Sequence, residues 1–288
     1  MNQIKTVALL GLLSGLLITI SYSVLGGTGG AIFGIGLAAV TNLGAWYFSD
    51  RIALAAYRAQ PVSAQQAPGL HRMVERLAQR ADMPTPAIYV IPGAAANAFA
   101  TGRDPNHAAI AVTEGIVNLL SGDELEGVIA HELSHILNRD TLTQAVAATI
   151  AGAISFLAQM LSYAMWFGGF SRDENGPNPL ALLGTVILAP IAATVLQLGI
   201  SRTREFAADA GAARLTGNPQ ALARALQRLE ASARRRPMGG NPAFEPLMIV
   251  NAVPKQFLSS LFATHPSIEQ RVERLLGMAV APHGVYSL

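Results

Sequence analysis

Three long stretches of this sequence contain no charged residue, and they constrain the fold more than any other feature. They run from Thr6 to Ser49, from Thr141 to Ser171 and from Asn175 to Ser201. Each is long enough to cross the hydrocarbon core of a bilayer, which takes about 20 apolar residues as a helix. Only 13% of all residues are charged, against about 25% in an average soluble domain. We therefore expect part of the chain to lie in a membrane.

The glycine-rich turn Gly26–Gly30 divides the first stretch, so we expect four transmembrane helices. The expected spans are Thr6–Leu25, Ala31–Phe48, Ala145–Phe167 and Pro179–Ile200. A cleaved signal peptide explains the first stretch less well, because the apolar segment is too long and a second one follows directly. For the last two spans the alternative is a buried hairpin in a soluble core, although about 10–14 residues suffice for a core helix.

Nearly all basic residues fall on one side of this four-helix arrangement. Arg172 is the exception; the other 19 of the 20 Lys and Arg residues precede the first span, separate the second from the third, or follow the fourth. The positive-inside rule assigns that side to the cytoplasm, so we expect both termini there. The net charge of +2 and the scattered basic residues do not indicate nucleic-acid binding. The absence of cysteine excludes disulfides and thiolate metal sites.

The polar segment between the second and third spans has helix and strand signals of its own. Apolar spacing predicts an amphipathic helix that includes Leu70, Val74 and Leu77. Three short strands are expected at Ala87–Ile91, Asn97–Thr101 and Ala108–Val112. Ser121 followed by Glu124 is the capping-box pattern that begins a helix.

That helix carries the motif His131-Glu132-Leu133-Ser134-His135. Residues four apart share one helix face, so both imidazoles point at one spot. Two neutral imidazoles suit a zinc ion, and this is the H-E-x-x-H pattern of zinc proteases. Glu132 can take a proton from a water molecule at the metal and pass it to a leaving amine. The alternative is a helix with two surface histidines.

A catalytic zinc needs a third protein ligand and one open position. Glu205 stands out among the acidic candidates, because Asp209 follows it by four residues and shares its helix face. Glu205 can ligate zinc, and Asp209 can accept the outer N–H of a ligand histidine. From spacing alone, local ion pairs with nearby arginines remain an alternative for both.

The order of these features is similar to that of the HtpX family of bacterial membrane-bound zinc endopeptidases, relatives of the eukaryotic CAAX prenyl-protein endopeptidase. Two apolar spans precede H-E-x-x-H, and a membrane hairpin separates it from Ser201-Arg202-Thr203-Arg204-Glu205-Phe206-Ala207-Ala208-Asp209. The resemblance covers nearly the whole chain. It implies one Zn²⁺ per chain held by His131, His135 and Glu205, with Glu132 as catalytic base and Asp209 supporting a ligand.

The resemblance implies a mainly α membrane protein of the bacterial inner membrane, with a zincin-like cytoplasmic catalytic domain of helices and a small β-sheet. Residues 1–48 would form an N-terminal transmembrane hairpin and residues 145–200 a second one. Residues 49–144 and 201–288 would form the two parts of the catalytic domain. The motif helix runs into the third span, so we expect membrane or unfolded proteins as substrates. The family is linked to protein quality control under stress.

Two further elements resemble the family less specifically. Asn97-Ala98-Phe99-Ala100 resembles the edge strand beside many zinc protease sites, so Asn97, Ala98 and Phe99 are expected to bind a substrate main chain. An ordinary loop asparagine is the alternative. His265 resembles the family's C-terminal His-Pro element and could stabilise an oxyanion. Its alternative is a helix start, which Pro266 favours.

Two functions from other classes compete with a protease. A membrane-anchored zinc-binding scaffold without turnover would use the same ligands, but a structural site has no use for a base such as Glu132. A metal transporter predicts charged or histidine residues inside the spans. The four expected spans contain none.

Overall fold

The computed structural model describes most of the N-terminal half and three shorter parts of the C-terminal half. The described residues are 10, 11, 14, 15, 17–19, 21–23, 25–145, 203–236, 238, 247–250 and 266–278. The fourth expected span, all of the third except Ala145, and His265 lie outside them. The first expected span lies partly outside, and its described residues are helical.

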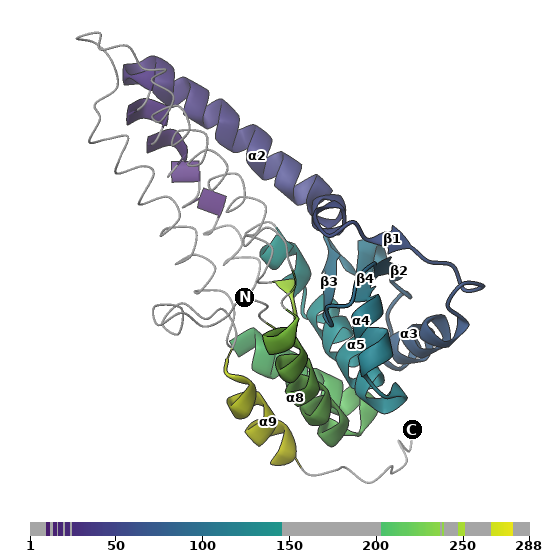
Figure 1. The fold of residues 1–288 in the computed structure, drawn as a ribbon. Coiled ribbons are helices and arrows are strands. Elements are labelled where there is room, and N and C mark those ends of the chain that lie inside the picture. The colour runs from purple at the N-terminus through teal and green to yellow at the C-terminus, as the bar shows by residue number, and fades with distance from the viewer. Residues whose placement is uncertain are drawn as a thin grey trace.

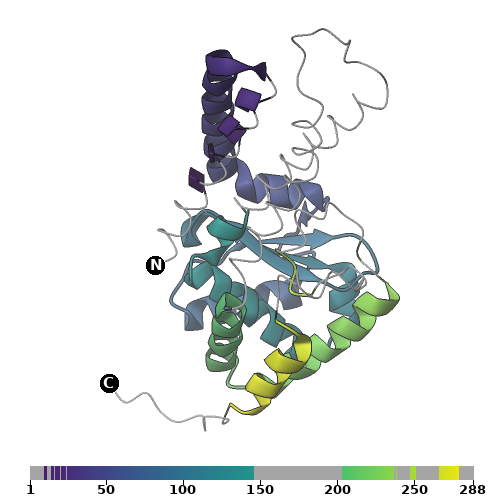
Figure 2. The ribbon, with the colours of Figure 1, turned by 90° about the vertical axis from the view of Figure 1, so that its left-hand side faces the viewer.

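The second expected span forms one long helix, α2 (Gly27–Ala56). Its segment Gly27–Gly44 is long and apolar enough to cross a membrane, and among the described residues it is the one candidate. At 1.5 Å per residue the helix is about 45 Å long, longer than a hydrocarbon core of about 30 Å. Figures 1 and 2 show α2 projecting from a globular domain that its C-terminal end joins.

The described residues before Gly26 pack against α2. Gly26 and Gly27 have positive φ, 78° and 57°, and break the helix where the sequence predicts a turn. A Cβ at Gly34 would lie 2.8 Å from Cα of Ile18, and one at Gly30 would collide with the carbonyl of Ser21. Two glycines one turn apart therefore let the helices approach closely, as small residues do in membrane helix pairs.

The globular domain contains a four-stranded mixed sheet in the order β1-β2-β4-β3. Its strands are β1 (Gln60–Pro61), β2 (Ala87–Ile91), β3 (Ala98–Gly102) and β4 (Ala108–Thr113). β2 pairs parallel with β4, and β3 pairs antiparallel with β4 and forms an edge. The three expected strands are confirmed to within one residue. The two-residue β1 was not expected.

The C-terminal end of α2 lies against one face of this sheet, and the other helices of the domain lie on the opposite face. They are α3 (Pro68–Arg80), α4 (Glu114–Leu119), α5 (Gly122–Leu137), a helix at 203–216, α8 (Pro219–Arg235) and α9 (Ile268–Leu276), with a 3₁₀ turn η1 (Pro105–His107). Ile110 and Val112 of β4 face the main core with α3, α5 and α8. Ala109 and Ala111 face a smaller core with Leu54 at the end of α2. All six residues of β4 are therefore buried.

Candidate active site

Helix α5 carries the H-E-x-x-H motif into the interior of the globular domain. The helix begins after Ser121, whose backbone N–H donates to Glu124 Oε2 at 2.9 Å. The expected capping residues therefore lie at its start. His131, Glu132 and His135 are all buried, although two of them carry polar nitrogens and one a carboxyl group. Buried polar groups of this kind need partners, and their partners define the site.

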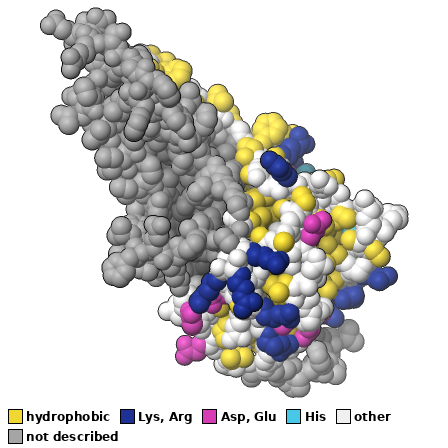
Figure 3. Space-filling view, in the orientation of Figure 1, with side chains coloured by type: hydrophobic (Ala, Val, Ile, Leu, Met, Phe, Trp, Pro, Cys, Tyr) yellow, Lys and Arg dark blue, Asp and Glu magenta, His cyan; other side chains and the backbone are white. Residues whose placement is uncertain are grey.

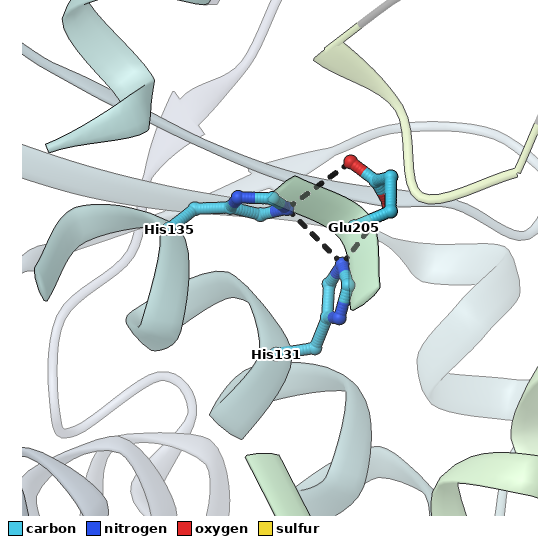
Figure 4. Close-up of side chains that lie close together, drawn as sticks. All are labelled: His131, His135 and Glu205. Carbon is cyan, nitrogen blue, oxygen red and sulfur yellow. Dashed lines mark hydrogen bonds and ion pairs between the residues drawn. The ribbon is translucent and has the colours of Figure 1, made fainter. Parts of the chain in front are cut away.

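The two histidines meet Glu205, which the helix at 203–216 supplies from the other side (Figure 4). Their Nε2 atoms lie 3.1 Å apart. Glu205 places Oε2 3.5 Å from Nε2 of His131 and Oε1 3.4 Å from Nε2 of His135. Among the described residues this is the one group of three or more such side chains that could hold a metal ion.

These separations fit a tetrahedral zinc ion. With bonds of about 2.0–2.1 Å, the ligand atoms of such an ion lie about 3.3–3.4 Å apart. The separation of the two Nε2 atoms, 3.1 Å, and the distance from each of them to its nearest Glu205 oxygen, 3.5 and 3.4 Å, are close to that value. Two imidazoles and one carboxylate are also a ligand set that catalytic zinc sites use, with a fourth position left for water or substrate.

Close packing of α5 against the helix at 203–216 makes this meeting possible. A Cβ at Gly211 would lie 2.8 Å from Cβ of Ser134 and would overlap its hydroxyl oxygen. Ser134 lies between the two histidines in sequence, and its hydroxyl donates to the carbonyl of Ala130. Glycine at 211 therefore sets the distance between the helix with the histidines and the helix with Glu205.

A carboxylate lies close to the Nδ1 atom of each histidine, on the side of the ring away from the other histidine's Nε2. Asp209 Oδ1 is 3.0 Å from Nδ1 of His131, and Asp140 Oδ2 is 3.2 Å from Nδ1 of His135. Burial raises the pKa of Asp209, but the charge of Arg271 and the hydrogen bonds from His131 and Arg271 lower it below its usual value. Such carboxylates fix Nδ1 as the protonated nitrogen and leave Nε2 free to bind a metal.

The sequence did not point to Asp140. This residue follows the end of α5, where Arg139 adopts a positive φ of 56°, and it begins the next helical segment. The carboxylate that results is 1% exposed and reaches His135, five residues earlier. Arg204 Nε lies 4.0 Å from its Oδ1 and is also buried. The one sequence signal for Asp140 was that an acidic residue follows the helix with the two histidines, and this signal is not specific.

The sequence also did not point to Arg271 of α9, whose side chain is fully buried. Its guanidinium donates to both oxygens of Asp209, at 2.9 and 2.7 Å, and lies 3.4 Å from Glu205 Oε2. A signal did exist. Arg271 shares the apolar helix face of Ile268, Val272 and Leu275, where a charge must be buried.

Glu132 lies between the histidines and the edge strand. Its carboxylate accepts a hydrogen bond from the backbone N–H of Ala100 on β3. Burial raises the pKa of Glu132 above its usual value, and the negative charge of Glu205 adds to this effect, although the two histidines oppose it. A carboxyl group whose pKa is raised accepts a proton more readily, which suits a general base.

The residues expected to bind substrate lie at and just before β3. Asn97 is buried, and its amide accepts from the N–H of Ala98 through Oδ1 at 3.0 Å. The side chain of Phe99 is fully buried and packs against Tyr57, with ring centroids 5.7 Å apart. Phe99 can therefore offer a substrate no side-chain contact in this conformation. His265, the expected oxyanion donor, lies outside the described residues.

The chain is similar to known proteins in both sequence and structure. Residues 64–279 match peptidase family M48. A protein named Protease HtpX homolog from Trichormus variabilis is 71% identical over 277 residues, and one from Pyrococcus furiosus is 48% identical over 278 residues; each alignment covers 96% of both chains. The crystal structure of S. mikatae Ste24p matches with a TM-score of 0.53 and 24% identity, covering 95% of this chain but 65% of that one. This last likeness concerns the fold alone.

Proposed function

Because the chain belongs to peptidase family M48, as an HtpX-type metalloprotease, we propose that it is a membrane-embedded, zinc-dependent endopeptidase. Its proposed substrates are membrane or misfolded proteins, and its proposed role is protein quality control. The observation that carries the proposal is the buried group of His131, His135 and Glu205 with Glu132 beside it. A structural zinc site would have no use for that neighbouring carboxylate.

We propose the following roles for the described residues in peptide hydrolysis. Zinc held by His131, His135 and Glu205 would polarise a water molecule and the scissile carbonyl. The carboxylate of Glu132 would accept a proton from the attacking water and return it to the departing amide nitrogen. Its hydrogen bond from the Ala100 N–H holds the carboxylate next to β3, where a substrate main chain could lie.

Several observations support a location in the membrane. On the face seen in Figure 3, the visible part of α2 shows hydrophobic side chains, whereas basic side chains gather over the globular domain. Ile32, Val40 and Leu43 of α2 are 67–71% exposed, which suits contact with lipid. The long uncharged stretches and the one-sided basic residues support a multi-pass protein of the bacterial inner membrane with a cytoplasmic catalytic domain.

Proteolysis by wild type and by Glu132→Gln tests the proposal. Both proteins are purified in detergent under chelator, reloaded with zinc, and offered casein and a membrane-tethered substrate. We expect one zinc per chain in both proteins and a loss of cleavage of about 10²–10⁴-fold in the variant, the usual contribution of a general base. Glu126→Gln is the matched control, because Glu126 lies on the same helix but pairs with Arg76 and Arg80 at the surface.

The other outcomes separate the alternatives. If wild type binds zinc and cleaves no substrate, the scaffold function replaces the protease. Equal cleavage by wild type and Glu132→Gln would show that Glu132 is not the base. Equal rates on soluble and membrane-tethered versions of one substrate would contradict the proposed preference for membrane proteins.

A further inference from the structure

A short, bent segment from the C-terminal half of the chain, residues 247–250, contacts the outer edge of β3. The N–H of Ile249 donates to the carbonyl of Ala98 at 3.1 Å. This carbonyl points away from the sheet, because the preceding carbonyl, that of Asn97, accepts from Thr113 N at the end of β4 and successive carbonyls alternate. Residues 247–250 therefore make the kind of main-chain bond that an added peptide strand makes.

Two side chains hold the same segment by its main chain. Asn97 donates from Nδ2 to the carbonyl of Val250 at 3.0 Å, while its Oδ1 is fixed by the N–H of Ala98. Arg271 donates from Nη1 to the carbonyl of Ile249 at 3.2 Å. Together with the hydrogen bond from Ile249 N–H to Ala98 O, these contacts all involve backbone groups of the segment. Such contacts recognise main-chain groups rather than a particular sequence.

The side chains of the segment are all aliphatic or thioether, and all are buried. Leu247 and Met248 pack into the small core with Phe99, and Ile249 and Val250 pack into the main core. All four are 5% exposed or less. The edge of β3 is therefore lined by apolar surface on both sides, which accommodates aliphatic side chains.

The groups that hold the segment are close to the proposed chemistry. Two residues beyond Ala98, the N–H of Ala100 donates to Glu132. Arg271 lies 3.4 Å from Glu205 Oε2 through the same Nη1 that holds Ile249. A substrate main chain that reached Glu132 along β3 would need Ala98 O, Asn97 Nδ2 and Arg271 Nη1, which residues 247–250 already engage.

We propose that residues 247–250 are an internal competitor that lies on the peptide-binding edge of β3 and must leave before a substrate binds. This proposal rests on the proposed protease function and adds a substrate class to it. The substrates are extended segments with aliphatic side chains, such as unfolding exposes. Because the segment keeps part of the population closed, it weakens the apparent affinity for substrate by the fraction of open protein.

Replacing Ile249 by proline tests the competition through kinetics. Ile249→Pro removes the one N–H that bonds Ala98 O, a net loss for the closed form of a typical hydrogen bond. With a short aliphatic peptide substrate, kcat/KM should rise about 3- to 10-fold through a lower KM, with kcat little changed. Ile249→Val keeps the N–H and most of the buried surface, and should behave as wild type. A lower kcat/KM in Ile249→Pro would show that the segment supports the site instead.

Hydrogen exchange tests the displacement without turnover and without altering the segment. The zinc-loaded, full-length Glu132→Gln protein in detergent is mixed with excess lysine-flanked Leu-Met-Ile-Val peptide, whose binding is followed by fluorescence polarisation. Exchange at residues 247–250 should become faster when the peptide binds. A peptide with an N-methylated isoleucine lacks the donor and should not have this effect.

The remaining outcomes oppose the proposal in distinct ways. Unchanged or slower exchange at 247–250 with peptide bound means that the two occupy different places. Absence of peptide binding means that the edge does not accept aliphatic strands. Because binding is measured without cleavage, a wild-type protein that cleaves nothing overturns the protease function and leaves the displacement to be judged by exchange.

Discussion

Arg271 donates two hydrogen bonds to Asp209, from Nε to Oδ2 at 2.9 Å and from Nη2 to Oδ1 at 2.7 Å. Asp209 in turn lies 3.0 Å from Nδ1 of His131. Helix α9 is therefore joined to a proposed zinc ligand through one shared carboxylate. Helix α9 supports the proposed metal site, although it supplies none of the three side chains that face one another there.

Removing the guanidinium should weaken both the fold and the metal site. Arg271→Gln leaves Asp209 buried without its countercharge, which typically costs about 3–5 kcal/mol. We expect a lower Tm and a zinc affinity reduced about 10- to 100-fold, the usual effect of disturbing a residue behind a ligand. Thermal unfolding and competition with a chelator measure the two effects. Arg235→Gln, at an exposed position of α8, should change neither. Wild-type zinc affinity in Arg271→Gln would contradict this account.

Asp140 should matter to zinc binding in the same way. Its Oδ2 lies 3.2 Å from Nδ1 of His135, and an asparagine there keeps the size but loses the charge. We expect Asp140→Asn to bind zinc at least about tenfold more weakly, as measured by chelator competition. Asp123→Asn is the control, since Asp123 forms a surface ion pair with Arg224. If both variants bind zinc equally well, Asp140 does not position His135.

Local periodicity explains what the sequence could predict about the site. His131 and His135 share a helix face because they are four apart, and Glu205 and Asp209 do so for the same reason. The structure then brings His131, His135 and Glu205 together. Such spacing is a property of one helix, so it can be read without knowledge of the fold.

The partners of those residues depend on tertiary contacts, and the sequence did not reveal them. Arg271 is 62 positions from Asp209 and 140 from His131. Residues 247–250 join β3 through one backbone bond, and four residues are too few to show a strand period. The capped helix α5 and strands β2, β3 and β4 were predictable because their signals are local.

Acid should remove the stabilisation that Glu124 provides at the start of α5. Glu124 Oε2 accepts from Ser121 N at 2.9 Å and from Arg228 Nη1 at 2.6 Å. Burial alone raises the pKa of Glu124, but the Ser121 hydrogen bonds and the charge of Arg228 lower it below its ordinary value of 4.5. The stabilisation is therefore present above pH 4.5 and is lost as pH falls through the lower folded pKa.

The measurement is the Tm difference between wild type and Glu124→Gln as a function of pH. We expect wild type to be more stable at pH 7 and the difference to shrink below pH 4.5. Glu126→Gln should give a smaller difference at pH 7, because its ion pairs with Arg76 and Arg80 are longer and exposed. A difference for Glu124→Gln that grows on acidification would reverse the assigned sign.

Replacing Gly211 by alanine should lower both the stability of the protein and its zinc affinity. Gly211→Ala places a methyl group against Ser134, so the helix with Glu205 must move away from α5. Overpacking of this kind typically costs about 1–3 kcal/mol. We expect a lower Tm and weaker zinc binding, because Glu205 would retreat from His131 and His135. Gly69→Ala is the control with the opposite sign: nothing lies within 4 Å of its added Cβ, and alanine favours a helix by about 1 kcal/mol.

A second substitution across the interface separates packing from other causes. Ser134→Gly removes the atoms that the new methyl group would meet, so the double variant Ser134→Gly/Gly211→Ala has room again. We expect the double variant to regain zinc affinity relative to Gly211→Ala alone. The glycine in α5 costs about 1 kcal/mol of helix stability, so the Tm of the double variant should stay below that of wild type. Recovery of zinc binding without full recovery of Tm would show that the contact between Gly211 and Ser134 sets the ligand distances. If the two substitutions are simply additive for zinc binding, that contact does not control the site.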